Sequence, residues 1–239
     1  LTPNAAMMQL SRRVPAGVVN EVHRYLVNGG PDNLANLHAF LSDTLLLTGD
    51  EFEPPQELPT WGVLDRPAAQ PDSGSPRVGV LFYRAQYAAG NTDYAHALCD
   101  AIDAAGGVGV PIHAASLRDA PDDLLAELGT LDALVTTVLA AGGTKPAHAQ
   151  AGGEDETWDV RPLAALDIPI IQGLCLTWSR EVWAASDDGM SPLDVATQVA
   201  VPEFDGRLIT VPFSFKEIDA DGLPAYVADP ERCARVAGI

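Results

Sequence analysis

Basic side chains are scarce in this sequence of 239 residues, in which 14 lysines and arginines stand against 33 aspartates and glutamates. The formal net charge is -19 at pH 7. Because nucleic-acid binding depends on clustered Lys and Arg that neutralise phosphates, a nucleic-acid partner is not expected. The acid excess would attract divalent cations or basic protein surfaces, and it is also a common basis of solubility.

Cysteine is also rare, with three widely spaced residues, Cys99, Cys175 and Cys233. Their number is odd and no CxxC pair occurs, so the pattern predicts neither a disulfide framework nor a zinc site. Such thiols are typical of a reducing compartment, and we expect the protein in the cytoplasm. With 47% hydrophobic residues, the chain can bury a sizeable core without cross-links.

Long apolar runs are missing as well. No stretch approaches the roughly 18 to 20 residues that a membrane helix needs, so membrane association is not expected. The sequence opens Leu1-Thr2-Pro3-Asn4, without the basic and apolar regions of a signal peptide and without an initiator methionine. We therefore expect it to be a piece of a longer protein.

Several common catalytic motifs are absent. The sequence has no GxxxxGK[ST] motif, so Gly142-Gly143-Thr144-Lys145 is not a P-loop, and hydrolysis of ATP by this chain alone is not expected. Neither HExxH nor GxSxG occurs, which excludes the commonest zinc-protease and serine-hydrolase classes.

Three regions of different character divide the sequence. Residues 1–52 are a helical segment, because apolar residues recur at helical spacing on both sides of Asn28-Gly29-Gly30-Pro31 and predict a helical hairpin. Residues 53–76 are rich in proline and lack periodicity, which is typical of an extended connector. Residues 77–239 are predicted to form an α/β domain.

Strand-like and helix-like segments alternate in this third region. Strands are predicted at 78–83, 108–113, 133–138 and 168–172, and helices at 92–105 and 122–128. The alternation predicts an α/β fold, in which the helical hairpin is followed by a Rossmann-like parallel sheet with helices on both faces. The polar, glycine-containing stretch 141–157 is long for a compact unit, and we interpret it as a mobile lid or a disordered excursion.

A helix start is predicted at Ser191. Serine is a favourable N-cap residue, Pro192 suits the first helical position, and Asp194 complements the helix dipole in the first turn. The apolar face of this helix is expected to comprise Leu193, Val195, Ala196 and Val199.

The end of the same helix brings two carboxylates close together in the sequence. Pro202 is expected to stop the helix, Asp205-Gly206 to form a turn, and 208–211 to form a strand. Asp205 is explained as a turn former, because it precedes glycine. Glu203 has no such local explanation, so it is the stronger candidate for chemistry.

The first predicted strand of the sheet leads into a candidate anion site. Gly90, Asn91 and Thr92 open the next helix, where backbone N–H groups and the helix dipole can hold an anion, and Arg84 lies just upstream. Ordinary capping of the helix by Asn91 or Thr92 is the alternative. His96 follows one turn later and could point toward the same site, but a surface or core position is the favoured explanation.

Three segments together resemble the CobN-type large subunit of aerobic cobaltochelatase, which is related to the large subunit of magnesium chelatase. One segment spans 176–217 and reads LTWSREVWAASDDGMSPLDVATQVAVPEFDGRLITVPFSFKE. Another runs from Val80 to Ala101 through Gly90-Asn91-Thr92, and a third covers 25–37. The resemblance spans most of the chain, and family members are far longer, which again implies a fragment.

The resemblance implies a catalytic and metal-handling role for Glu203, with His96 as a further metal ligand. Insertion of a divalent metal into a tetrapyrrole requires removal of protons from two pyrrole nitrogens and delivery of a partly dehydrated ion. A carboxylate can serve both steps.

The resemblance also implies that Arg84, Asn91 and Thr92 bind the carboxylates of the tetrapyrrole, because an acidic chain otherwise repels them. Lys216, near the end of the 176–217 segment, is one of only a few cations in the carboxyl-terminal half, so a substrate carboxylate or Glu203 is expected as its partner. An exposed Lys216–Glu217 neighbourhood is the alternative explanation.

The function implied by the resemblance is insertion of cobalt into hydrogenobyrinic acid a,c-diamide, in cobalamin biosynthesis. Cobalt would be a substrate, and ATP would be used by separate AAA+ and accessory chelatase subunits and not bound here. A family motif resembling GxHGxxEW is not in this chain, so the fragment alone is expected to be inactive. Two alternatives stay open, a non-catalytic α/β ligand-binding or protein-docking module and a relative that chelates magnesium or nickel.

Overall fold

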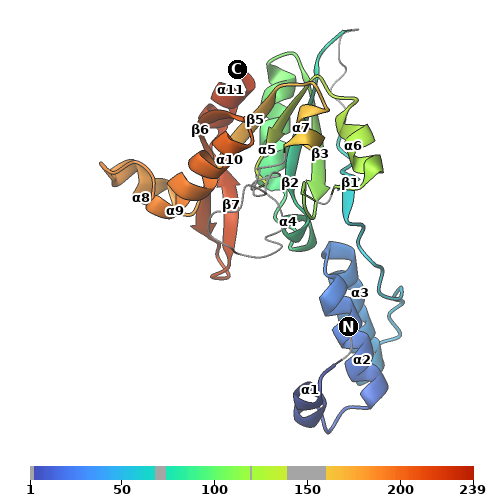
Figure 1. The fold of residues 1–239 in the computed structure, drawn as a ribbon. Helices are drawn as coiled ribbons and strands as arrows, with labels where there is room; N and C mark the ends of the chain where they lie inside the picture. The colour runs from blue at the N-terminus through green and yellow to red at the C-terminus, as the bar shows by residue number, and fades with distance from the viewer. Residues whose placement is uncertain (1–2, 68–73, 119, 139–159) are drawn as a thin grey trace, which may run out of the picture. The chain divides into compact units, whose positions relative to one another are not determined.

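The computed structural model describes residues 3–67, 74–118, 120–138 and 160–239. It divides into two compact units, one of residues 1–59 with 85–90 and the other of residues 60–84 with 91–239 (Figure 1). The stretch 141–157, interpreted above as a lid or excursion, lies outside the described residues. None of the described helices is both long and apolar enough to cross a membrane.

The first unit contains the helical hairpin that the sequence predicts. Its helices are α1 (Ala5–Leu10), α2 (Ala16–Asn28) and α3 (Pro31–Leu46). Gly29 and Gly30 join α2 to α3 with φ angles of 65° and 88°, a backbone conformation that residues with a side chain rarely adopt. The short helix α4 (Arg84–Ala88) contributes to this unit, because Gly30 N donates to Ala88 O at 2.8 Å.

The side chain of Asn33 connects the start of the proline-rich stretch to the helical hairpin through hydrogen bonds. Its side-chain amide donates to Gln56 O at 2.8 Å, and its carbonyl accepts from Gln56 N at 2.9 Å. Tyr25 Oη donates to Glu53 O at 2.5 Å. Asn33 is only 3% exposed, so these bonds satisfy polar groups that are removed from water.

The second unit is built on a sheet of seven strands in the order β1-β3-β2-β4-β5-β6-β7. The strands are β1 (Trp61–Val63), β2 (Arg77–Tyr83), β3 (Val108–Ala114), β4 (Ala133–Thr136), β5 (Ile170–Leu176), β6 (Leu208–Ile218) and β7 (Pro224–Ala228). The five central strands are parallel, as the alternating sequence pattern predicts. The two edge strands, β1 and β7, pair antiparallel and were not predicted.

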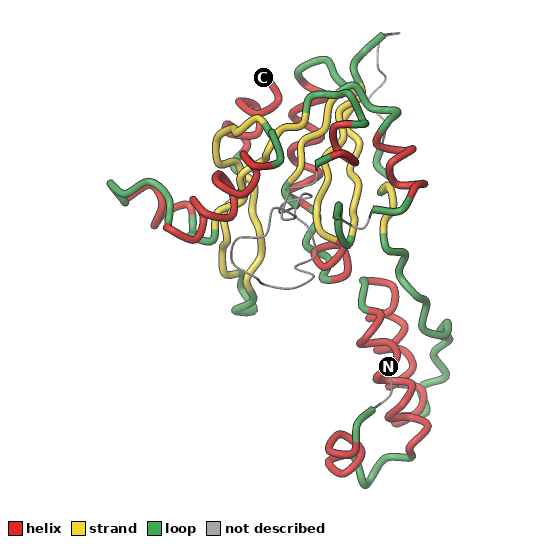
Figure 2. The backbone as a smooth tube through the Cα atoms, in the orientation of Figure 1, coloured by secondary structure: helices red, strands yellow, loops and turns green. Residues whose placement is uncertain are grey.

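Helices cover both faces of the sheet (Figures 1 and 2). On one face lie α5 (Asp93–Ala104) and α11 (Pro230–Ala237), which we call the α5 face. On the other lie α6 (Asp122–Leu128), α7 (Arg161–Ala164) and the crossover helices described below, which we call the α10 face. Residues of β2 alternate between the faces, since Phe82 contacts Tyr94 of α5 whereas Leu81 packs with the leucines of α6.

The crossover from β5 to β6 contains α8 (Arg180–Ala185), α9 (Pro192–Asp194), the π-helix η1 (Val195–Ala200) and α10 (Val201–Phe204). The predicted helix start is confirmed, because Ser191 Oγ accepts from Asp194 N at 3.0 Å. The predicted turn is also confirmed, with Gly206 at φ 74°.

The predictions for the middle of this helix are wrong in two respects. Pro202 does not end the helix, which continues to Phe204. It lies in the first turn of α10, directly after the π-helix, a position at which proline is tolerated. Three of the four residues of the expected apolar face are exposed, among them Leu193 at 60% and Val195 at 44%, whereas Val199 is half-buried. The side facing the sheet is partly polar and includes the buried residues Asp194 and Gln198.

Candidate functional site

The strand order places a topological switch point between β2 and β4. From β2 the chain passes to β3 on one side, and then crosses to β4 on the other side of β2. In open α/β sheets, ligands bind outside the carboxyl ends of the strands at such a point. The carboxyl edge of the sheet, where β2, β4, β5 and β6 end, is therefore the candidate functional site.

Four of the predicted residues lie at this carboxyl edge. Arg84 directly follows β2, and Asn91 and Thr92 precede the start of α5. Lys216 lies near the carboxyl end of β6 and pairs with Tyr226 of β7. The parallel strands thus bring to one edge two cationic side chains and a helix N-terminus, although these are far apart in the sequence.

Asn91 joins the start of α5 to strand β7. Its side-chain carbonyl accepts from Tyr226 N at 3.1 Å, and its amide donates to Tyr226 O at 3.4 Å. The side chain therefore pairs with the main chain of β7, in the way that a neighbouring strand would. Thr92 occupies the N-cap position of α5 but makes no side-chain capping hydrogen bond.

Tyr226 also contacts the lysine of the site. Lys216 Nζ lies 5.8 Å from the centre of the Tyr226 ring, a cation–π distance. The Tyr226 ring in turn lies 5.7 Å from that of Tyr94 on α5. Burial raises the pKa of Tyr226 to about 12, so its hydroxyl group stays protonated and neutral at physiological pH.

The two predicted metal ligands lie apart. His96 is on α5, whereas Glu203 is on α10, so the sheet lies between them. Within the described residues, no group of three His, Cys, Asp or Glu side chains could hold a metal ion. A role of Glu203 in metal handling and a role of His96 in metal handling are therefore two separate predictions.

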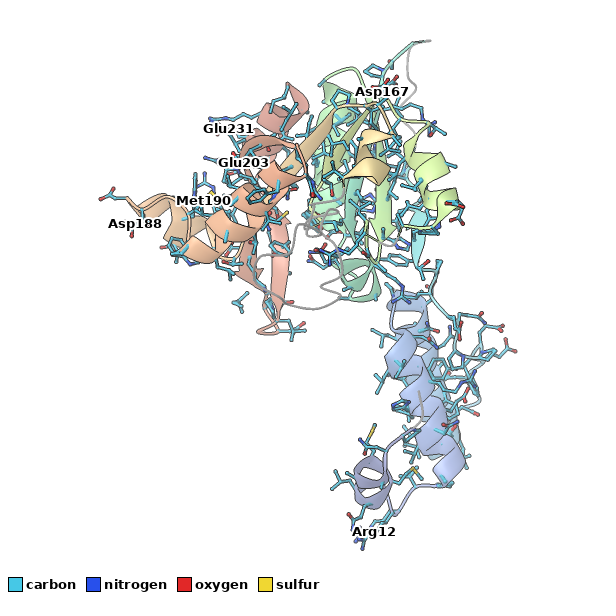
Figure 3. All side chains as sticks on the ribbon, viewed as in Figure 1. Arg12, Asp167, Asp188, Met190, Glu203 and Glu231 are labelled. Carbon is cyan, nitrogen blue, oxygen red and sulfur yellow. The ribbon has the colours of Figure 1, made fainter. Side chains whose placement is uncertain are left out.

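Glu203 lies at the opposite end of the sheet from the basic residues. It is exposed on α10, which leads into the amino end of β6 (Figure 3). Lys216 is eight residues along β6 from Leu208, a distance of about 26 Å in an extended strand. An ion pair between Lys216 and Glu203, one of the two pairings considered for Lys216 from the sequence, is therefore not formed.

Asp205, interpreted from the sequence as a turn former, also forms a buried ion pair with Arg207. Arg207 Nη2 lies 2.6 Å from Asp205 Oδ2, and both side chains are 0% exposed. Burial lowers the pKa of Arg207, and the Asp205 carboxylate opposes that shift. The guanidinium group also donates to Gln172 Oε1 of β5 at 2.7 Å.

A second buried carboxylate connects β5 to the crossover helix. Asp194 Oδ1 accepts from Thr177 N at 3.1 Å, and its Oδ2 accepts from Thr177 Oγ1 at 3.0 Å and from Ser191 Oγ at 2.8 Å. Thr177 directly follows β5, so these bonds fix the start of α9 at the carboxyl edge.

The π-helix places Gln198 against an irregular part of β5. The register between β5 and β6 shifts on both sides of Leu174. Gln198 Oε1 accepts from Cys175 N and from Gln172 Nε2, both at 3.4 Å. A buried side chain therefore accepts a backbone hydrogen bond where the regular strand pairing is interrupted.

His113 is a further titratable residue near this edge. It is 3% exposed on β3, and burial, together with the nearby charge of Arg84, lowers its pKa to about 4. In the unfolded chain the pKa is near 6.5. The neutral imidazole thus favours folding above pH 6.5, and this contribution is lost as the pH falls toward 4.

We therefore expect the free energy of unfolding to fall by roughly 2 kcal/mol between pH 7 and pH 4.5, because His113 takes up a proton in the unfolded chain while the buried imidazole of the folded chain stays neutral. Urea titrations at several pH values would measure this, with His113→Gln as the variant that cannot titrate. The prediction fails when the variant loses as much stability on acidification as the wild-type chain does.

Sequence reasoning missed Arg207, Asp194, Gln198 and Tyr226 as parts of this region. Arg207 carried a signal, since it is one of 14 basic residues and stands two positions from an acid across a glycine turn. No sequence pattern marked Gln198 or Tyr226, because their hydrogen-bond partners are distant in the sequence. The contacts of Gln198 depend on the irregular part of β5, and those of Tyr226 depend on the edge strand β7.

The fold and the site define a doubly wound α/β domain with basic side chains at its carboxyl edge. A family model described as CobN/Magnesium Chelatase matches residues 23–239. The chain belongs to the CobN/magnesium chelatase family, which confirms the resemblance found in the sequence.

Individual relatives agree with this assignment. The chain is 30% identical, over 95% of its length, to the aerobic cobaltochelatase subunit CobN of Pseudomonas aeruginosa. A solved structure, the catalytic subunit of cobaltochelatase from Mycobacterium tuberculosis, is 64% identical over 96% of the chain, with a TM-score of 0.88. The magnesium-chelatase subunit ChlH of Oryza sativa is 28% identical over 61% of the chain. The chain spans about a fifth of these longer cobaltochelatase proteins, 19% and 20% of their lengths.

Proposed function

We propose that this chain is part of the tetrapyrrole-binding subunit of an ATP-dependent cobaltochelatase, which inserts cobalt into hydrogenobyrinic acid a,c-diamide in cobalamin biosynthesis. Cobalt is a substrate of the reaction. Separate AAA+ subunits hydrolyse ATP, accessory chelatase subunits are further partners, and the reaction takes place in the cytoplasm.

One observation carries the proposal, the 64% identity to the cobaltochelatase catalytic subunit over 96% of this chain. The identity to the magnesium-chelatase subunit is 28%, which supports cobalt over magnesium as the metal. The carboxyl edge adds a chemical reason. An anionic macrocycle needs cationic partners on a protein of net charge -19, and Arg84 and Lys216 supply them there.

Quenching of tryptophan fluorescence by hydrogenobyrinic acid a,c-diamide tests the proposal. Trp178 follows β5 at the carboxyl edge, and its carbonyl accepts from Lys216 N at 3.1 Å. We expect saturable quenching at micromolar ligand that is largely lost in Trp178→Phe and retained in Trp61→Phe, because Trp61 lies on the far edge strand β1. Absence of quenching would favour the non-catalytic docking module.

The same titration tests the basic residues. Arg84→Gln and Lys216→Gln are each expected to raise the Kd for the macrocycle about tenfold, because each removes a charge-assisted contact with a carboxylate. Arg24→Gln in the helical unit changes the net charge equally and should leave the Kd unchanged. Equal effects of all three substitutions would show that only overall charge matters.

A further inference from the structure

The Asp205–Arg207 ion pair is buried more completely than stability alone explains. Both side chains are 0% exposed. Removing two charges from water costs several kcal/mol per ion, and replacement of such pairs by apolar residues is often neutral or stabilising. A fully buried pair therefore points to a role in specifying geometry.

The geometry that Arg207 specifies is the end of β4. Its Nη1 donates to Val138 O at 2.6 Å and to Gln172 Oε1 at 2.7 Å. Val138 stands two residues after β4, at the carboxyl edge. The guanidinium group thus connects the start of β6 to the main chain that leaves β4.

The neighbouring residue is held from the other side. Thr137 N donates to Leu81 O of β2 at 2.9 Å, and Thr137 Oγ1 lies 3.5 Å from Tyr94 Oη of α5. The chain leaving β4 is therefore fixed on one side by β2 and α5 and on the other by Arg207. Because β2 and β4 flank the switch point, these bonds determine the backbone path at the candidate site.

The turn between α10 and β6 orients the arginine. Gly206 adopts a φ of 74°, which places Asp205 and Arg207 on either side of a tight turn. The planar guanidinium group can then bind the carboxylate through one nitrogen and the two oxygens of Val138 and Gln172 through the other. Lysine has no such fork of donors.

We propose that Arg207, held by Asp205, is a positioning residue for tetrapyrrole binding, which fixes the backbone of Val138 at the switch point. The proposal rests on the proposed function for its ligand. It extends that function by giving Arg207, a buried residue on the α10 face, a role in shaping the site at the carboxyl edge.

The test uses the double variant Asp205→Asn with Arg207→Met, which removes both charges together. Three quantities are measured on the 239-residue chain: the urea midpoint, hydrogen exchange of the Thr137 and Val138 amides, and the Kd for hydrogenobyrinic acid a,c-diamide. Glu231→Gln with Arg235→Met, which removes an exposed pair on α11, is the matched control. Arg207→Lys is the second variant, should the double variant not fold.

We expect the double variant to keep its urea midpoint, to exchange the Thr137 and Val138 amides at least tenfold faster, and to bind the macrocycle at least tenfold more weakly. Arg207→Lys should give the same pattern with smaller changes. Unchanged exchange of the Thr137 and Val138 amides would overturn the proposal. Faster exchange of these amides without weaker binding of the macrocycle would also overturn it. So would faster exchange of amides throughout the chain together with a lower urea midpoint, because that result indicates general destabilisation. A wild-type chain that binds no macrocycle would refute the proposed function, and the exchange data would still decide whether Arg207 positions Val138.

Discussion

Replacement of Gly109 by alanine is expected to lower the free energy of unfolding by about 3 kcal/mol. A Cβ atom at this position of β3 would lie 2.6 Å from Cys99 Cα and 2.8 Å from Cys99 O. These are backbone atoms of α5, which cannot rotate away. Gly109 itself is held, since its N–H donates to Asp103 Oδ1 at 2.8 Å and its carbonyl accepts from Arg66 at 3.1 Å.

Gly129→Ala, in the same unit, is the matched control for this prediction. Gly129 follows α6 with a φ of -67°, and an added Cβ would meet nothing closer than 3.4 Å. The free energy of unfolding of the Gly129→Ala variant should be unchanged or up to about 1 kcal/mol higher, because alanine restricts the conformations of the unfolded chain. Urea titration compares the two, and equal stability of both variants would refute the close packing of α5 on β3.

Substitution of Glu203 by glutamine is expected to slow metal insertion about 100-fold in a chelatase subunit of full family length. Glutamine preserves the size of the side chain and removes its charge and its basicity. Glu203 lies at the amino end of β6, about 26 Å along the strand from the level of Lys216. We therefore expect it to act on the incoming metal and to leave the Kd for the macrocycle unchanged.

Rates of cobalt insertion and the macrocycle Kd should be measured on the same preparation. Glu181→Gln on α8 is the control, because it removes another exposed carboxylate of the crossover. Equal loss of insertion and binding in Glu203→Gln would indicate a structural role. An unchanged insertion rate would remove Glu203 from the mechanism.

Local signals in the sequence predicted much of the architecture. The hairpin follows from helical spacing around Gly29 and Gly30, the central strands from short apolar runs, and the start of the crossover helix from Ser191. Each of these depends on neighbours within a few residues. Arg84, Asn91 and Thr92 could be grouped from the sequence because they lie between a predicted strand and the helix after it, whereas the position of Lys216 at the same edge depends on the pairing of β6.

The remaining features depend on contacts that local patterns do not contain. The outward apolar face of the crossover helix contradicts the usual amphipathic pattern, because Asp194 and Gln198 are needed inside to bind backbone and hydroxyl groups around β5. Likewise, Pro202 is tolerated because it lies in the first turn of α10, directly after the π-helix. The short strands β1 and β7 are formed through pairing with β3 and β6.

The assignment of residues 85–90 to the helical unit has a consequence for dissecting the chain. A truncation that begins at residue 60 would delete the hairpin yet keep this short piece of it. Ala88 would then lose the hydrogen bond that it accepts from Gly30 N. Separate expression of the α/β unit therefore requires a short polar linker between Arg84 and Asn91 as well as removal of the amino-terminal helices.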